Sequence, residues 1–273
     1  MKLSSYIAFW DKEIASFLSP TGSSYPISLG VSIQKDYIPE PFLGDPTPNR
    51  YSFVIVNLNP GTGVCHSCIK QQSVGGTLIH KVKTMGYSVA VKDFPYLQEG
   101  TDVGLIDWDD SPGRKWWEGK ERWIKHMISV CNPSYNSSDP IPDDYYPFAM
   151  ELFAWHTKSW PNVLNKKMES SGVHGSVVYS DVIEPLYEAI KGSKYKFAFC
   201  VGKPIGNIIG SFPLFSKKNK EPIQPIGSIN RFYDIYFDNK GCYIINTWAP
   251  GGNTYPSEKY YEKEKELVKS FKK

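Results

Sequence analysis

The chain has 273 residues, of which 41% are hydrophobic and 15% aromatic, enough for a sizeable buried core. It carries 31 Lys+Arg against 28 Asp+Glu. The formal net charge of +3 therefore excludes a strongly basic surface, and any polyanion must bind at a local patch. The 5 cysteines have no repeated spacing, which argues against a secreted disulfide framework and favours reduced thiols.

The N-terminal segment predicts an amphipathic helix at about 4–17. Asp11, Lys12 and Glu13 interrupt its apolar pattern, so it does not match the apolar core of a signal peptide. No apolar run approaches the roughly 20 residues that a membrane helix needs. We therefore expect a cytoplasmic protein with no membrane partner. Repeated prolines oppose regular structure in the rest of residues 1–50, which we expect to wrap a surface.

The middle of the chain alternates predicted strands and helices. Residues 51–56 are nearly all apolar and predict a strand buried on both faces, as in a parallel sheet. Helices are expected at about 76–85 and at 114–130, where an aromatic stripe with helical spacing is assigned to the core. The aromatic segment 148–160 predicts a second strand with polar chemistry at its C-terminal end. Residues 132–147 between them are expected to form a loop.

The C-terminal part continues the alternation. Asp181 is predicted as the N-cap of a helix that stops at Gly192. The segment "KYKFAFCVGKPIGNII" predicts a strand, a glycine turn and a helix. Two further strands joined through 238–241 are followed by a charged helix at 257–272.

The order of elements predicts an α/β fold, a three-layer αβα sandwich with a mostly parallel central sheet. No repeat and no long linker marks a boundary, so we expect one domain over 1–273. Its parts would be the N-terminal helix and wrap (1–50), the core (51–256) and the C-terminal helix (257–273). Ligands of such sheets bind off the carboxyl ends of the strands. Polar residues follow four predicted strands, and we expect them to line one crevice; they lie at 57–63, 156–160, 202–207 and 247–253.

Cys65 and Cys68, with His66 between them, have the spacing of half a zinc site. A structural zinc site needs four ligands, and the chain has no second paired element. Cys200 and Cys242 lie in predicted buried strands and are expected to behave as small hydrophobes. We therefore expect no metal and no cofactor. A zinc-dependent hydrolase built on the 65–68 segment is a third alternative.

Two residues are candidates for chemistry. The amide of Asn59, fixed by Pro60 at a strand end, can orient an attacking water, although the 57–61 loop is alternatively a plain turn. His156 has a titratable ring that can donate to a ligand carbonyl or a developing anion; alternatively, a backbone carbonyl satisfies it. Trp248 either packs in the core or presents an apolar tip that stacks on a base or enters a duplex.

Taken together, the four strand ends resemble the uracil-DNA glycosylase superfamily over about residues 51–256. That family places a water-positioning Asp or Asn in a first-strand loop of the form Gly-x-Asn-Pro-Gly. Here "LNPG" at 58–61 matches it, with Asn57 in place of the leading glycine. The family's second loop, His-Pro-Ser-Pro, maps onto 248–253, where its histidine is absent. Thr62 and its neighbours replace an aromatic that stacks on the base, which suggests a roomier pocket.

The resemblance implies a DNA glycosylase that binds a flipped-out nucleotide and hydrolyses the N-glycosidic bond of uracil or a modified base. Asn59 would hold the attacking water and His156 would stabilise the leaving base. The partner would be single- or double-stranded DNA bound in the crevice by a monomeric protein. The alternative is a catalytically inactive member of the fold that binds nucleic acid or a protein. The implied substrate contacts are Asn57, Leu58, Pro60, Gly61, Thr157, Trp248 and Asn253, and the implied DNA contacts are Lys158, Lys203, Gly251 and Gly252.

Overall fold

The computed structural model describes the residues 1–19, 33–58, 68–71, 73, 78–92, 112–157, 179–218, 231–249 and 256–271. The chain forms two compact units. Unit 1 comprises Met1–Pro46, Asn57–Trp108 and Phe148–Ala189, and unit 2 comprises Thr47–Val56, Asp109–Pro147 and Ile190–Lys273.

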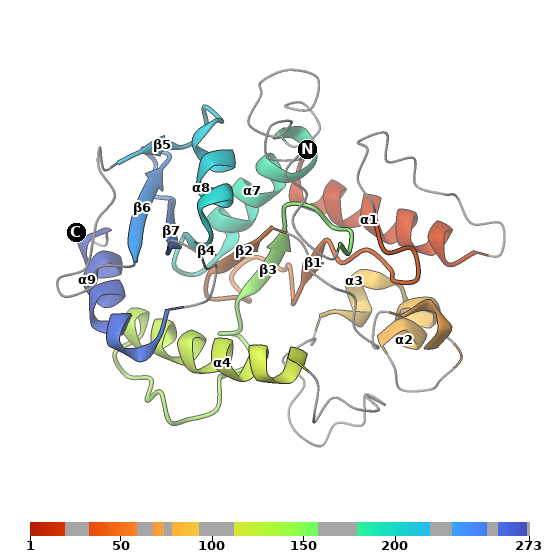
Figure 1. The fold of residues 1–273 in the computed structure, drawn as a ribbon, viewed down its shortest axis with the longest axis horizontal. Helices are drawn as coiled ribbons and strands as arrows, with labels where there is room; N and C mark the ends of the chain where they lie inside the picture. Colours follow the sequence, from red (N-terminus) through yellow and green to blue (C-terminus); the bar gives the residue numbers. More distant parts are fainter. Residues whose placement is uncertain are drawn as a thin grey trace. The chain divides into compact units, whose positions relative to one another are not determined.

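Strands and helices alternate along the described chain (Figure 1). The strands are β1 (Phe42–Leu43), β2 (Val54–Asn57), β3 (Phe148–Glu151), β4 (Phe197–Val201), β5 (Ser216–Lys217), β6 (Phe232–Phe237) and β7 (Tyr243–Trp248). The helices are α1 (Leu3–Phe17), α2 (Leu78–Met85), α3 (Tyr87–Ala90), α4 (Pro112–Cys131), α7 (Glu184–Gly192), α8 (Lys203–Gly210) and α9 (Tyr261–Phe271). Short 3-10 turns lie at Ile69–Gln71 and Glu258–Tyr260, and a π-helical turn at Tyr179–Ile183.

The strands form a mixed seven-stranded sheet of order β1-β3-β2-β4-β7-β6-β5. β4 pairs in parallel with both β2 and β7. The β1–β3, β5–β6 and β6–β7 pairs are antiparallel. The predicted α/β class with parallel central strands and flanking helices is therefore confirmed. None of the described helices is long and apolar enough to cross a membrane.

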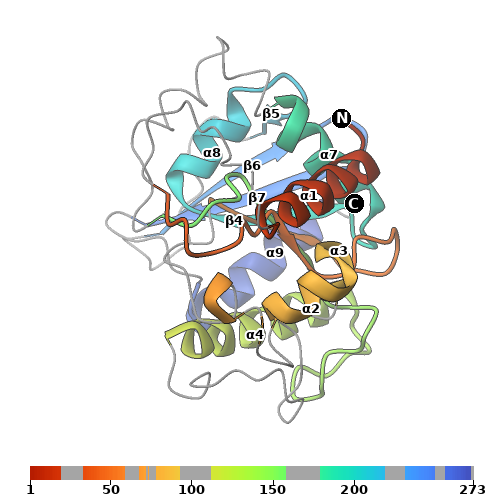
Figure 2. The same ribbon diagram turned by 90° about the vertical axis from the view of Figure 1, so that its right-hand side faces the viewer.

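In unit 2, helices cover both faces of the strands. Figure 2 shows α8 on one side of β6 and β7 and α9 on the other. The core beneath α4 centres on Trp123, whose ring lies 4.3 Å from that of Phe199 and 5.7 Å from that of Phe53. Ile124, with Met127 and Ile128, is buried in the same helix, which confirms the predicted core stripe.

In unit 1, α1 buries the face that its sequence spacing predicts. Leu3, Tyr6, Trp10 and Ile14 recur every three or four residues and are all buried. On another face of α1, the carboxylate of Asp11 accepts the N–H and the hydroxyl of Ser88, both at 2.7 Å, in the first turn of α3. These bonds join α1 to a short helix that the sequence did not predict.

The proline-rich approach contains a strand, contrary to the prediction of an irregular wrap. Phe42 and Leu43 pair with Met150 and Ala149 of β3. Pro41, directly before β1, accepts the N–H of Glu151 at 3.0 Å. Proline lacks a donor but keeps its carbonyl, so it is tolerated at the start of an edge strand.

Three boundaries also differ from the predictions. β3 ends at Glu151, so His156 lies beyond the strand instead of at its end. Asp181 lies inside the π-helical turn and is not the N-cap of α7, although α7 does end at Gly192. The two-residue strand β5 was not predicted, because a strand this short is defined by its pairing with β6.

Candidate functional site

The end of β2 is held by three hydrogen bonds in unit 1. The amide Nδ2 of Asn57 donates to Oε1 of Glu151 at 2.7 Å. The N–H groups of Leu152 and Phe153 donate to the carbonyls of Asn57 and Leu58, each at 2.9 Å. The chain is therefore fixed at the point where it leaves the sheet toward the "LNPG" motif.

His156 contacts the segment around Glu40 through its ring and its backbone. The ring is 1% exposed, and its Nε2 lies 3.3 Å from Oε1 of Glu40. The His156 carbonyl accepts the N–H of Gln34 at 2.9 Å, and the carbonyl of Ala154 accepts the N–H of Glu40 at 2.8 Å. A carboxylate oxygen thus lies beside the ring and restricts the orientation of the imidazole.

Glu40 and Glu151 both lie near the buried hydroxyl of Tyr87. Burial, followed by these two carboxylates, raises the pKa of Tyr87 well above its usual value. Glu40 is 7% and Glu151 6% exposed. We call Glu40, Asn57, Glu151 and His156 the acidic cluster of unit 1. Buried carboxylates are stable only with such partners.

Neither glutamate of the acidic cluster was predicted as a site residue. Glu151 interrupts the apolar run "FAMELF", and Glu40 stands between two prolines and apolar neighbours in "IPEPF". A charge inside an apolar segment is the signal that could have found them, because glutamate is seldom fully buried unless it is paired.

In unit 2, the ends of β4 and β7 meet at the start of α8. The N–H of Gly202, a residue with φ of 135°, donates to the carbonyl of Thr247 at 2.8 Å. Lys203 follows as the first residue of α8, and its Nζ lies 5.0 Å from the ring centroid of Trp248. Two residues predicted for substrate or DNA contact, Lys203 and Trp248, therefore lie together.

The indole N–H of Trp248 donates a hydrogen bond within the protein. Its Nε1 donates to Oδ2 of Asp234 at 2.9 Å, and its ring stacks on Phe232 at 4.4 Å. Lys217 approaches the other oxygen of Asp234 at 2.7 Å. Trp248 is thus anchored, and its indole N–H is not directed at a ligand.

A buried amide lies beneath α8. Asn246 on β7 is fully buried, and its side chain has no hydrogen-bond partner among the described residues. It packs against Gly206, where a Cβ would come within 2.5 Å of Nδ2. The absent side chain at position 206 lets α8 approach the sheet.

The predicted site residues are divided between the units. Asn57 and His156 belong to the acidic cluster of unit 1. Leu58 and the buried Thr157 also lie in unit 1, whereas Lys203 and Trp248 belong to unit 2. Outside the described residues lie Asn59, Pro60, Gly61, Lys158, Gly251, Gly252 and Asn253, and also Cys65 and His66.

The described cysteines do not form a metal site. Within the described ranges, no group of three or more His, Cys, Asp or Glu side chains is arranged to hold a metal ion. Cys200 and Cys242 are buried as predicted, and burial raises the pKa of both thiols, that of Cys242 to about 11. They behave as small hydrophobes.

Comparison of the chain with protein-family models, with curated proteins and with solved structures gives no match. The fold therefore defines its class, an α/β protein with a mixed sheet that is parallel at its centre.

Proposed function

We propose that the protein is a hydrolase of the uracil-DNA glycosylase type, which binds a nucleotide flipped out of DNA and cleaves the N-glycosidic bond of uracil or a modified base. The observation that carries the proposal is the anchoring of Asn57 and Leu58 beside Glu151 and Phe153. The next residue in the sequence is Asn59, and a catalytic amide needs such a fixed approach to hold a water in place.

The strand order supports this location. β2 lies between β3 and β4 in the sheet. After β2, the chain therefore forms β3 on one side of this strand and later β4 on its other side. At such a reversal of direction, α/β sheets bind ligands outside the carboxyl ends of their strands. The "LNPG" motif follows β2, the strand at this reversal.

In the proposed reaction, the bond between C1′ and the base nitrogen breaks, and the base leaves with the electron pair. The sugar becomes oxocarbenium-like, and the water held by Asn59 adds its oxygen to C1′. One proton of that water ends on the base, so that charge and atoms balance. Because the base departs before the water adds, the water needs little activation. An amide, which orients water but is a poor base, is therefore sufficient.

His156 has an electrostatic part in the proposal. Its ring is buried against Glu40, so we assign it charge stabilisation and not direct proton transfer. Positive charge held in a dry site favours a departing base anion more than the same charge in water. Glu40 then acts as the residue that positions this ring.

The test is base release from oligonucleotides that contain uracil, other deaminated bases or modified cytosines. We expect release from at least one of them, and a loss of about a hundredfold or more for Asn59→Ala. Lys70→Gln, an exposed change in unit 1, is the matched control and should keep full activity. Equal behaviour of the wild type and Asn59→Ala on every substrate would overturn the enzymatic proposal.

A second candidate function is binding without hydrolysis, on the same fold. It is favoured by Trp248, because this residue stands where the family has its histidine and its only donor is bound to Asp234. DNA or protein binding that survives both Asn59→Ala and His156→Ala, with no turnover in the wild type, is the result expected for this candidate.

A further inference from the structure

The helix α9 of unit 2 has a small buried face that contains a carboxyl group. Among its described side chains, Glu264, Leu267 and Val268 are buried, and their spacing places them on one helical face. A helix of 11 residues is only marginally stable by itself in water, so α9 depends on the contacts of this face. The ionic residues outside this face are Glu262, Lys263, Lys265, Glu266 and Lys269.

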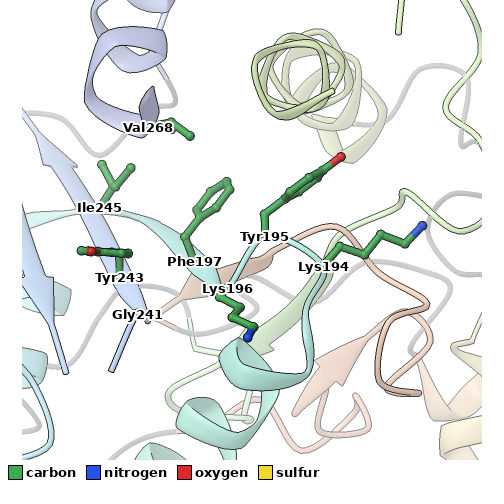
Figure 3. A pocket seen from close by; sticks show the side chains of 8 residues that line it. All are labelled: Lys194, Tyr195, Lys196, Phe197, Gly241, Tyr243, Ile245 and Val268. Atoms are coloured by element: carbon green, nitrogen blue, oxygen red, sulfur yellow. The ribbon is translucent and has the colours of Figure 1, made fainter. Parts of the chain in front are cut away.

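The apolar part of this face lies beside a pocket. Figure 3 shows Phe197 of β4 and Ile245 of β7 on the side of the sheet where Val268 lies. These three residues help to line a pocket of about 340 Å³. Side chains that border a pocket lose the contacts that packed atoms would make there. The apolar contacts of α9 are therefore incomplete, and its polar contacts matter more for its attachment.

Glu264 joins α9 to two other elements. Its carboxyl group lies 2.9 Å from Nε1 of Trp123 on α4 and 3.0 Å from the hydroxyl oxygen of Tyr233 on β6. All three side chains are 0% exposed. The carboxyl group is therefore shielded from bulk water while α9 is docked. A negative charge at this position would have to be stabilised by the protein alone.

A buried arginine lies on the β6 side of Glu264. Arg231, directly before β6, is 5% exposed. Its Nη1 donates to Oγ1 of Thr247 at 3.1 Å, and its guanidinium lies 5.3 Å from the ring centroid of Tyr260. Burial raises the pKa of Glu264 to about 8, against the opposing effects of its two hydrogen bonds and of Arg231. Near neutral pH, the docked helix therefore holds this carboxyl group in its uncharged form.

The remaining titratable groups near Glu264 are Lys120, His126, Tyr261, Glu262 and Lys265, on α4 and α9. Lys120 is buried. Nε2 of His126 lies 2.9 Å from the carbonyl oxygen of Tyr261, and the two rings stack at 4.2 Å. Burial lowers the pKa of His126 and raises that of Tyr261 to about 12. Neither ring therefore changes its charge appreciably between pH 7 and pH 8.5.

We propose that Glu264 is a pH-sensitive latch, which holds α9 against α4 and β6 in its uncharged form and releases the helix when it ionises. The released helix leaves Trp123 and Tyr233 open to water while the sheet stays folded, as in the local opening of a small structural unit. In the docked helix, the pKa of Glu264 is about 8, against about 4.5 in water. Opening therefore becomes easier as the pH rises through this interval.

Hydrogen exchange followed by mass spectrometry tests the latch in the full chain. Protection factors, which are corrected for the chemical exchange rate at each pH, are compared at pH 7 and pH 8.5. We expect the protection of the α9 amides to fall about five- to tenfold over this interval. It should also lie at least tenfold below that of the β4 amides in the same unit. Equal protection of α9 and β4 would show that the helix opens only when the whole unit unfolds, and the latch would be excluded.

Two variants separate Glu264 from the other titratable groups. Glu264→Gln keeps the size of the side chain but cannot ionise, so the protection of α9 should agree within about twofold at the two pH values. Glu262→Gln, on the exposed side of the same helix, is the matched control and should retain the five- to tenfold fall. The same fall in Glu264→Gln would assign the pH dependence to Lys120 or His126 and overturn the proposal.

Trypsin provides a second measurement, which needs only the wild type. It cleaves after lysine, and Lys263 and Lys265 lie within α9. Because cleavage requires an open helix, its rate follows the population of the open form. After correction for the cleavage of an unstructured peptide of the same sequence, cleavage in α9 should be about five- to tenfold faster at pH 8.5 than at pH 7. Equal corrected rates would refute the latch.

Discussion

The carboxyl group of Glu264 on α9 accepts a hydrogen bond at 2.9 Å from the indole of Trp123 on α4, and both side chains are fully buried. Its other oxygen accepts the hydroxyl of Tyr233 on β6 at 3.0 Å. Burial raises the pKa of Glu264 to about 8, although these two hydrogen bonds and the nearby Arg231 oppose the rise. Glu264 therefore keeps a proton at neutral pH.

This proton makes stability depend on pH. Between the unfolded pKa of about 4.5 and the folded pKa of about 8, the folded state binds a proton that the unfolded state has lost. Stability is therefore greatest below the unfolded pKa and falls as the pH rises through this window. The wild type should lose on the order of 2–4 kcal/mol of its free energy of unfolding between pH 5 and pH 8.5.

Urea unfolding at these two pH values, for the wild type and Glu264→Gln, measures the effect. Glutamine keeps the shape but carries no charge, so the variant should lack the loss of stability that Glu264 causes over the window. Glu262→Gln on the exposed face of α9 is the matched control and should retain the wild-type slope. A wild type with equal stability at both pH values would contradict the prediction.

Glu151 should hold the end of β2 through its acceptor oxygen. We expect Glu151→Ala to destabilise the protein by about 1–3 kcal/mol, because it removes this acceptor from the partly buried amide of Asn57. Hydrogen exchange at the N–H groups of Leu152 and Phe153 should become faster. Glu151→Gln retains an acceptor and should restore slow exchange, so equal exchange in both variants would exclude this role.

The Glu40–His156 pair should show strong energetic coupling. Glu40→Gln and His156→Gln each change one member of a buried polar contact, so each should destabilise the protein by about 1–3 kcal/mol. Their double variant should lose less than the sum, with an interaction of about 1–3 kcal/mol. Thermal unfolding of the four proteins measures it, and additive losses would show that the two side chains act independently.

Gly206 should tolerate no side chain. Gly206→Ala places a Cβ within 2.5 Å of Nδ2 of Asn246, so α8 or the amide must move, at a cost of about 1–3 kcal/mol. Chemical denaturation measures this loss. In the background of Asn246→Ala the amide is gone, and the same change at position 206 should cost much less; an undiminished cost would place the clash elsewhere.

The elements that were predicted well are those with a strong local pattern. α1 and α4 bury apolar residues at helical spacing, and β4, β6 and β7 are rich in aromatic and β-branched residues. β1 and β5 have two residues each and no pattern of their own. Their strand conformation comes from pairing with β3 and β6, which a single sequence does not reveal.

The candidate site was predicted only in part for a similar reason. Asn57 and His156 stand out locally, as a polar residue after a strand and as a histidine in an aromatic segment. Glu40 lies 116 positions before His156 by their residue numbers, and Glu151 lies 94 positions after Asn57. Such pairings depend on the folded topology, so the acidic cluster became visible only in the structure.

Both edges of the sheet are short and carry residues that oppose further pairing. β1 is preceded by Pro41, which offers no N–H, and β5 ends in Lys217, whose ammonium binds Asp234. An incoming strand from another molecule would therefore find few unpaired backbone groups to extend the sheet. The edges thus limit self-association by strand addition, and they should protect the protein from aggregation at the high concentrations that binding experiments require.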